Sequence, residues 1–200
     1  RLRRSGRKAL IPFVMGGDPS LAMTESLIIA LAASGADLIE IGIPFSDPLA
    51  DGPIIQRASG RALAHGTTPG AVLACVARVS ARVTVPLVLL SYWNPIARYG
   101  NGSLEPGPFV RAAQRAGVSG IIVPDLPPEE AASFRRAAHR YAVAPVFLAA
   151  PTSPASRLRR IVRASEGFIY YVSVTGTTGV RKRLPAELAH HLRQVRLMTT

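Results

Sequence analysis

The sequence predicts an α/β fold in which a parallel sheet is covered by helices. Short runs rich in Ile, Val and Phe recur along the 200 residues, and longer segments with helical spacing of their apolar residues separate these runs. The runs are apolar along most of their length, as is typical of parallel strands that are buried on both faces. Glycine and proline stand at nearly every junction, where they separate one element from the next.

Six of these runs are predicted to be strands because they are short and carry β-branched or aromatic side chains. In chain order they are residues 9–14, 36–43, 85–91, 118–123, 143–148 and 167–174.

The segments between the strands are predicted to be helices, since apolar residues recur there at intervals of three and four. They are residues 24–34, 53–65, 69–79, 108–116, 129–141, 154–164 and 185–197. In the first of them Leu27, Ile28 and Leu31 share one face. No linker or low-complexity stretch divides the chain, so we expect one domain over residues 1–200.

Two architectures fit this alternation, a doubly wound open sheet and a TIM (β/α)8 barrel. Doubly wound nucleotide folds usually carry a glycine-rich phosphate turn, but neither G-x-G-x-x-G nor G-x-x-x-x-G-K occurs here. Polar residues instead follow most of the predicted strands, namely Asp18, Asp47, Asp51, Asn94, Asp125 and Thr175 to Thr178. This layout favours a barrel with its active site at the carboxyl ends of the strands.

Composition excludes several classes of protein. The net charge of +12 comes from scattered arginines, many spaced four apart like Arg57 and Arg61, which is typical of solvated helix faces and not of a nucleic-acid-binding stripe. The longest apolar run, residues 83–90, is too short to span a membrane. A single cysteine, Cys75, excludes an internal disulfide framework and a cysteine-based zinc site. No secretory signal is recognisable, and we expect a cytoplasmic protein.

Glu40 is unusual because it is a carboxylate inside an apolar strand. Strand alternation places it on one face with Leu38 and Gly42. Without a partner a buried carboxylate is strongly disfavoured or becomes neutral. Glu40 is therefore either paired with an arginine or backbone donors, or it is an acid/base group with a raised pKa. Asp47 and Asp51 follow on a proline-bracketed loop; an Asx turn is the simpler interpretation for Asp47, whereas Asp51 forms a plausible carboxylate pair with Glu40.

The segment Glu40-Ile-Gly-Ile-Pro-Phe-Ser-Asp-Pro-Leu-Ala-Asp-Gly-Pro53 resembles the signature of the tryptophan synthase α subunit family, E-[LI]-G-[IV]-P-F-S-D-P-x-A-D-G-P. Residues 11–19, 89–95, 121–130 and 170–179 also resemble that family's motifs, in the same order. The resemblance implies a TIM barrel that cleaves indole-3-glycerol phosphate to indole and glyceraldehyde 3-phosphate, a retro-aldol step of tryptophan biosynthesis. It implies no metal or cofactor in this subunit, and a tryptophan synthase β subunit as partner in an α2β2 complex.

The resemblance also implies roles for single residues. Glu40 matches the glutamate that protonates the indole ring and assists loss of the side-chain hydroxyl proton, and Asp51 matches the aspartate that binds the indole N–H. The matched substrate-binding positions are Phe13, Leu90, Ile122, Tyr170, Thr178 and Gly179, of which the last two lie in a loop expected to close over the substrate. The matched interface positions are Pro44, Asp47 and Asp125. For Phe13, Leu90 and Ile122, ordinary barrel core is an equal alternative.

The main departure from the family lies at the ends of the chain. We count about six of eight βα units, and the family's last two strands, with their phosphate loops, do not occur before Thr200. We therefore expect an incomplete barrel, either a piece of a longer protein or a truncated product. The alternatives to an active lyase are a non-catalytic remnant that at most binds a β subunit, and another phosphate-sugar TIM-barrel enzyme. The second is disfavoured because Glu40 and Asp51 lie within one specific segment.

Overall fold

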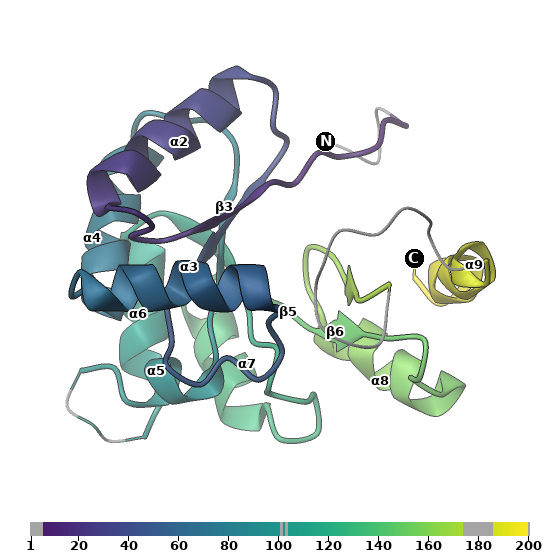
Figure 1. The fold of residues 1–200 in the computed structure, drawn as a ribbon. Coiled ribbons are helices and arrows are strands. Elements are labelled where there is room, and N and C mark those ends of the chain that lie inside the picture. Colours follow the sequence, from purple (N-terminus) through teal and green to yellow (C-terminus); the bar gives the residue numbers. More distant parts are fainter. Residues whose placement is uncertain (1–5, 101, 103, 174–185, 200) are drawn as a thin grey trace.

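The computed structural model describes residues 6–100, 102, 104–173 and 186–199. Strands and helices alternate along the chain, as the sequence predicts (Figure 1). None of the helices in these ranges is long and apolar enough to cross a membrane.

The main sheet has five parallel strands, and their order in the sheet is their order in the sequence. They are β1 (Phe13–Met15), β2 (Ile39–Gly42), β3 (Leu87–Leu90), β4 (Val118–Ile122) and β5 (Ala144–Val146). A doubly wound sheet would reverse its strand order at a switch point, so this order supports the barrel interpretation. A second parallel pair is formed by β6 (Leu148–Ala149) and β7 (Tyr170–Tyr171).

All seven predicted helices are present with shifted ends. They are α2 (Leu21–Ala33), α3 (Pro53–Ala64), α4 (Pro69–Ser80), α6 (Gly107–Arg115), α7 (Ala132–Arg140), α8 (Ala155–Ala164) and α9 (Leu188–Leu197). Their starts follow local chemistry. Thr68 caps α4 by accepting a hydrogen bond from the Ala71 N–H at 3.2 Å, and prolines open α3 and α4, where no N–H donor is needed.

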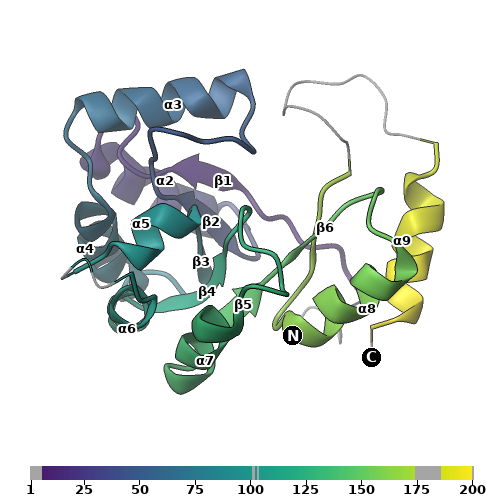
Figure 2. The ribbon, with the colours of Figure 1, turned by 90° about the horizontal axis from the view of Figure 1, so that it is seen from below.

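The structure differs from the predicted elements in two places. The predicted fifth strand divides into β5 and β6, because the N–H of the buried Phe147 turns to the Ser165 hydroxyl at 3.3 Å. Figure 2 shows β6 beside the main sheet, followed by α8. The predicted helices also do not include the short helix α5 (Trp93–Ala97) after β3, whose first N–H donates to Asp125 Oδ1 at 2.8 Å.

The two faces of the main sheet have different neighbours. Ile39 and Ile41 of β2 are fully buried in the large cluster that the sheet forms with the helices. On the opposite face a smaller cluster contains Val88, Ile122 and Val146, with residues of β6 and β7 packed against it. Glu40 alternates with the two isoleucines and therefore projects from this second face.

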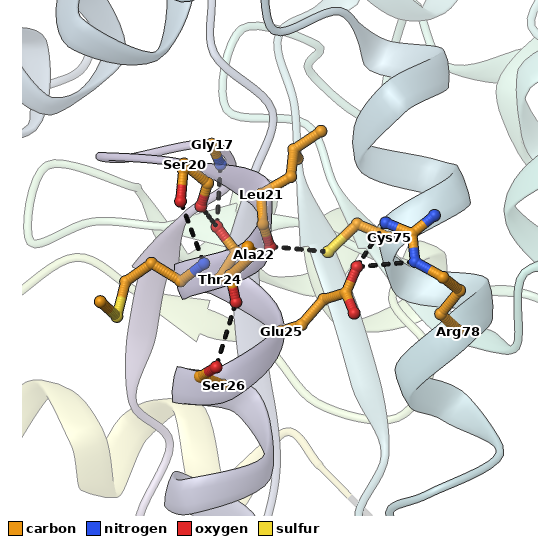
Figure 3. A network of polar contacts seen from close by, with 10 residues as sticks. Gly17, Ser20, Leu21, Ala22, Thr24, Glu25, Ser26, Cys75 and Arg78 are labelled. Carbon is orange, nitrogen blue, oxygen red and sulfur yellow. Dashed lines mark hydrogen bonds and ion pairs between the residues drawn. The ribbon is translucent and has the colours of Figure 1, made fainter.

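The turn after β1 is fixed by polar contacts (Figure 3). The hydroxyl of the buried Thr24 accepts a hydrogen bond from the Gly17 N–H at 2.9 Å and donates to the Ser20 carbonyl at 3.0 Å. Farther along α2, Glu25 accepts a hydrogen bond from Arg78 Nε of α4 at 2.6 Å. These contacts hold α2 against both the turn and α4.

Gly17→Ala is expected to destabilise the protein. Gly17 has a φ of +87°, and a Cβ there would overlap the Thr67 side chain. The free energy of unfolding is therefore expected to fall by ~1–3 kcal/mol. The matched control is Gly60→Ala within α3, where a Cβ meets nothing within 4 Å and a gain of ~0.5–1 kcal/mol is expected. Urea unfolding of the two variants measures both effects, and equal midpoints would contradict the constraint at Gly17.

Candidate active site

Glu40 is the second residue of β2, and it is only 4% exposed. Its neighbours in register are Phe13 of β1 and Val88 of β3, which are both apolar. Its Oε1 is buried and has no hydrogen-bond partner among the residues that the structure describes. The paired interpretation of this carboxyl is therefore not supported.

Burial raises the pKa of Glu40 to about 7, and the negative charge of Asp51 adds to this effect. The cause is the loss of hydration around the charged form of the carboxyl. Near neutral pH Glu40 therefore populates both its protonated and its ionised form. A group in this state can both donate and accept a proton at little free-energy difference.

Asp51 lies on the loop between β2 and α3 and is half-buried. Burial raises its pKa, and a hydrogen bond from the Tyr92 hydroxyl lowers it. Glu40 Oε1 has no such donor among the described residues. The pKa of both carboxyls is raised, but only that of Asp51 is lowered in part by a hydrogen bond, so the two environments differ.

Tyr170 of β7 lies near the Glu40 and Asp51 carboxyls. Burial raises its pKa to about 12, and the charges of Glu40 and Asp51 contribute in that order. Electrostatic coupling of this kind requires proximity, so β2, its following loop and β7 bring three predicted site residues together.

The predicted apolar wall lies on the same face. Leu90 and Ile122 are in register with Gly42, two residues beyond Glu40 toward the carboxyl end of the sheet. A Cβ on Gly42 would lie 2.7 Å from Cζ of Phe13, so the Phe13 ring lies directly over this glycine. Ile122 is fully buried, whereas Phe13 and Leu90 are half-buried. The three side chains flank the carboxyl, although Ile122 is also part of the core.

A cavity of about 610 Å³ opens at the same end of the strands, between the loop after β4 and the loop after β6. Asp125, Leu148 and Arg157 are among its lining residues. Leu148 also packs against the cluster that Tyr170 contacts, so one wall of the cavity borders the face that carries Glu40.

The remaining predicted residues have different environments. Pro44 is buried, while Asp47 is exposed and accepts a hydrogen bond from the Ser46 hydroxyl. Burial raises the pKa of Asp125, against the effect of the hydrogen bond from the Trp93 N–H. Thr178 and Gly179 lie outside the described residues. In the ranges that are described, no three His, Cys, Asp or Glu side chains are grouped so that they could hold a metal ion.

Tyr92 is the site residue that sequence reasoning missed. It is 2% exposed, and its hydroxyl accepts a hydrogen bond from the Ala50 N–H at 2.9 Å, next to Asp51. The sequence pattern assigns no role to Tyr92 or to its neighbour Trp93. The available signal was its place directly after an apolar strand, at the end where the other polar residues gather.

Comparison with known proteins gives one consistent family. The family model described as tryptophan synthase alpha chain matches residues 1–200. Tryptophan synthase alpha chains of Geobacter sulfurreducens and Carboxydothermus hydrogenoformans are each 50% identical to this chain, over 98% of it and 72% of their own length.

Solved structures agree with the sequence comparison. A Mycobacterium tuberculosis tryptophan synthase structure has a TM-score of 0.89 at 36% identity, covering 98% of this chain and 73% of that one. A structure of the tryptophan synthase α2β2 complex from Pyrococcus furiosus has a TM-score of 0.86 at 39% identity, covering 96% and 75%. With the parallel sheet, these likenesses confirm the predicted α/β fold of the TIM-barrel class.

Glu40→Gln is expected to stabilise the protein at alkaline pH. The folded-state pKa of about 7 lies above the value of 4.5 for an exposed glutamate, so the stability that the neutral carboxyl provides is lost as pH rises from about 4.5 through about 7. Glutamine cannot ionise. The free energy of unfolding of the variant should therefore exceed that of wild type by on the order of 1–3 kcal/mol at pH ~8, but not at pH ~4.5.

Denaturant unfolding at the two pH values measures this difference. Glu130→Gln is the control, because Glu130 is exposed and the same substitution there should have equal effects at both pH values. A pH-independent effect of Glu40→Gln would contradict a raised pKa.

Proposed function

Because this chain belongs to the tryptophan synthase alpha chain family, we propose that it is a lyase that cleaves indole-3-glycerol phosphate to indole and glyceraldehyde 3-phosphate. This reaction is a retro-aldol step of tryptophan biosynthesis. The observation that carries the proposal is the buried Glu40 carboxyl with a pKa of about 7, whose Oε1 has no hydrogen-bond partner among the described residues and whose charge acts on Tyr170 together with that of Asp51. A cytoplasmic location is part of the proposal.

Glu40 is proposed to move the proton in both directions. Its neutral carboxyl protonates C3 of the indole ring, which makes the ring cationic. The resulting carboxylate then takes the proton of the hydroxyl on the adjacent side-chain carbon. The bond between that carbon and C3 breaks, its electron pair returns to the ring, and the hydroxyl carbon becomes the aldehyde. Glu40 ends protonated, and a pKa near neutrality suits a group that does both tasks.

Asp51 is proposed to stabilise the cation. Its carboxylate accepts the hydrogen bond of the indole N–H, where positive charge develops once C3 is protonated. A fixed anion acts most strongly in a site with little water, and Asp51 is half-buried. Phe13, Leu90 and Ile122 are proposed to hold the planar ring, Tyr170 to pack beside the substrate, and Thr178 and Gly179 to close over it.

The proposed partner is a tryptophan synthase β subunit, as in the α2β2 complex from Pyrococcus furiosus. Asp47 and Asp125 are exposed on the loops after β2 and β4, where they are free to meet another subunit at the carboxyl ends of the strands. Pro44 is buried in this chain, so its proposed role at the interface is to shape the loop that carries Asp47.

Glu40→Gln is expected to reduce indole release by at least ~10²-fold, the usual size of a general acid/base effect, with a smaller change in substrate binding. The assay follows indole formed from indole-3-glycerol phosphate by the complete protein together with its β subunit. Glu130→Gln should keep wild-type turnover, since that side chain is exposed. Near-normal turnover of Glu40→Gln would remove this carboxyl from the mechanism, and a wild-type protein that releases no indole would contradict the proposed lyase activity.

Asp51→Asn is expected to lower kcat and kcat/KM together. The substitution keeps the shape of the side chain but removes the charge, so it affects an interaction made mainly in the transition state. Steady-state kinetics on the same substrate distinguish this result from a rise in KM alone. The latter would mean that Asp51 only binds the substrate in its ground state.

A further inference from the structure

We propose that Tyr92 is the positioning residue for Asp51: its ring and hydroxyl hold the loop between β2 and α3 so that the Asp51 carboxylate is fixed in place. The inference rests on the proposed role of Asp51 and adds to it the group that determines where this carboxylate lies. Tyr92 acts through Asp51 and is not assigned any contact with the substrate.

Tyr92 itself is held from both sides by β4 and its following loop. The N–H of Ser91 donates to the Ile122 carbonyl at 3.0 Å, and the N–H of Trp93 donates to Asp125 Oδ1 at 2.8 Å. The side chain between these two anchors is almost completely buried. The position of Tyr92 is therefore determined by the sheet and not by the loop that it contacts.

Tyr92 contacts that loop at three points. Its ring packs on Phe45 with 5.4 Å between centroids, and its hydroxyl oxygen accepts the Ala50 N–H at 2.9 Å. The same hydroxyl makes a hydrogen bond with the Asp51 side chain. A hydroxyl that accepts one bond has its own proton left to donate, so the two contacts are compatible and fix the direction of the O–H toward the carboxylate.

The loop needs such an anchor because its tip is in solvent. Leu49 is 91% exposed, and Ala50 is exposed as well. Burial of apolar side chains therefore does not hold the residues just before Asp51. Gln56 Nε2 donates to the Asp51 carbonyl at 2.9 Å and fixes the backbone, but the contacts that reach the carboxylate and the preceding N–H come from Tyr92.

The hydrogen bond from Tyr92 affects the pKa of Asp51, which lies among other titratable groups. The titratable groups that face it are Glu40 of β2, Tyr170 of β7 and Tyr92 itself, and Asp125 of the loop after β4 acts on Tyr92. Burial and the charge of Asp51 raise the pKa of Tyr92, so the phenol remains a neutral donor. Its hydrogen bond lowers the pKa of Asp51, and the loss of the hydroxyl must raise that pKa.

Tyr92→Phe tests the inference because it keeps the ring contact with Phe45 and removes only the hydroxyl. In the complete protein with its β subunit, kcat for indole release should fall about 10- to 100-fold, as expected for one hydrogen bond to a charged group. The acid limb of kcat/KM should move to higher pH. Tyr141→Phe is the matched control, because Tyr141 follows α7, away from the site. Loss of this hydroxyl should change neither kcat nor the pH of the acid limb.

A third readout does not depend on catalysis. The Ala50 amide, which donates to the Tyr92 hydroxyl, should exchange its hydrogen faster in Tyr92→Phe than in wild type or in Tyr141→Phe. Unchanged kcat, an acid limb that does not move, or unchanged exchange at Ala50 would each overturn the positioning role. These outcomes differ from failure of the proposed function. If indole-3-glycerol phosphate is not the substrate, the wild-type protein releases no indole, while hydrogen exchange at Ala50 still reports on the contact with Tyr92.

Discussion

The site depends on one constraint: a strand of the parallel sheet carries a buried carboxyl, and no described residue donates a hydrogen bond to its Oε1. The isoleucines on either side of Glu40 occupy the face toward the helices, where both are fully buried. Glu40 must then project from the opposite face, between apolar neighbours in register. Low hydration there, and not a specific charge, is the main reason for its raised pKa.

The register of the sheet extends this constraint to the other residues. Because side chains alternate with a period of two, a slip of one residue in β2 would exchange Glu40 with an isoleucine and destroy both faces at once. The same register places Gly42 in line with Leu90 and Ile122, and it leaves room for the Phe13 ring over the glycine. The packing that stabilises the sheet therefore also positions the carboxyl and its apolar wall.

Much of this arrangement could be predicted from the sequence, for identifiable reasons. The order of strands and helices follows from apolar periodicity and from glycine and proline at the junctions, and Glu40 is conspicuous as a charge in an apolar run. The division between β5 and β6 was not predictable, because it depends on a hydrogen bond from Phe147 to a serine eighteen positions later in the chain. Tyr92 was missed because an aromatic residue after a strand is compatible with simple packing, and its polar contacts lie forty-two residues away in sequence at Ala50.

The contacts that were missed have a common property: they join loops that follow different strands. Asp125, after β4, fixes the backbone at Trp93, after β3, and the adjacent Tyr92 reaches the loop after β2. In a barrel these loops meet at the carboxyl ends of the strands, so a residue on one loop can orient a side chain on the next. Periodicity describes each element by itself and contains no information on such contacts. The two carboxyls accordingly differ in how they are held. Glu40 is placed by the strand that contains it, whereas Asp51 is held by hydrogen bonds with Tyr92, which follows the next strand of the sheet.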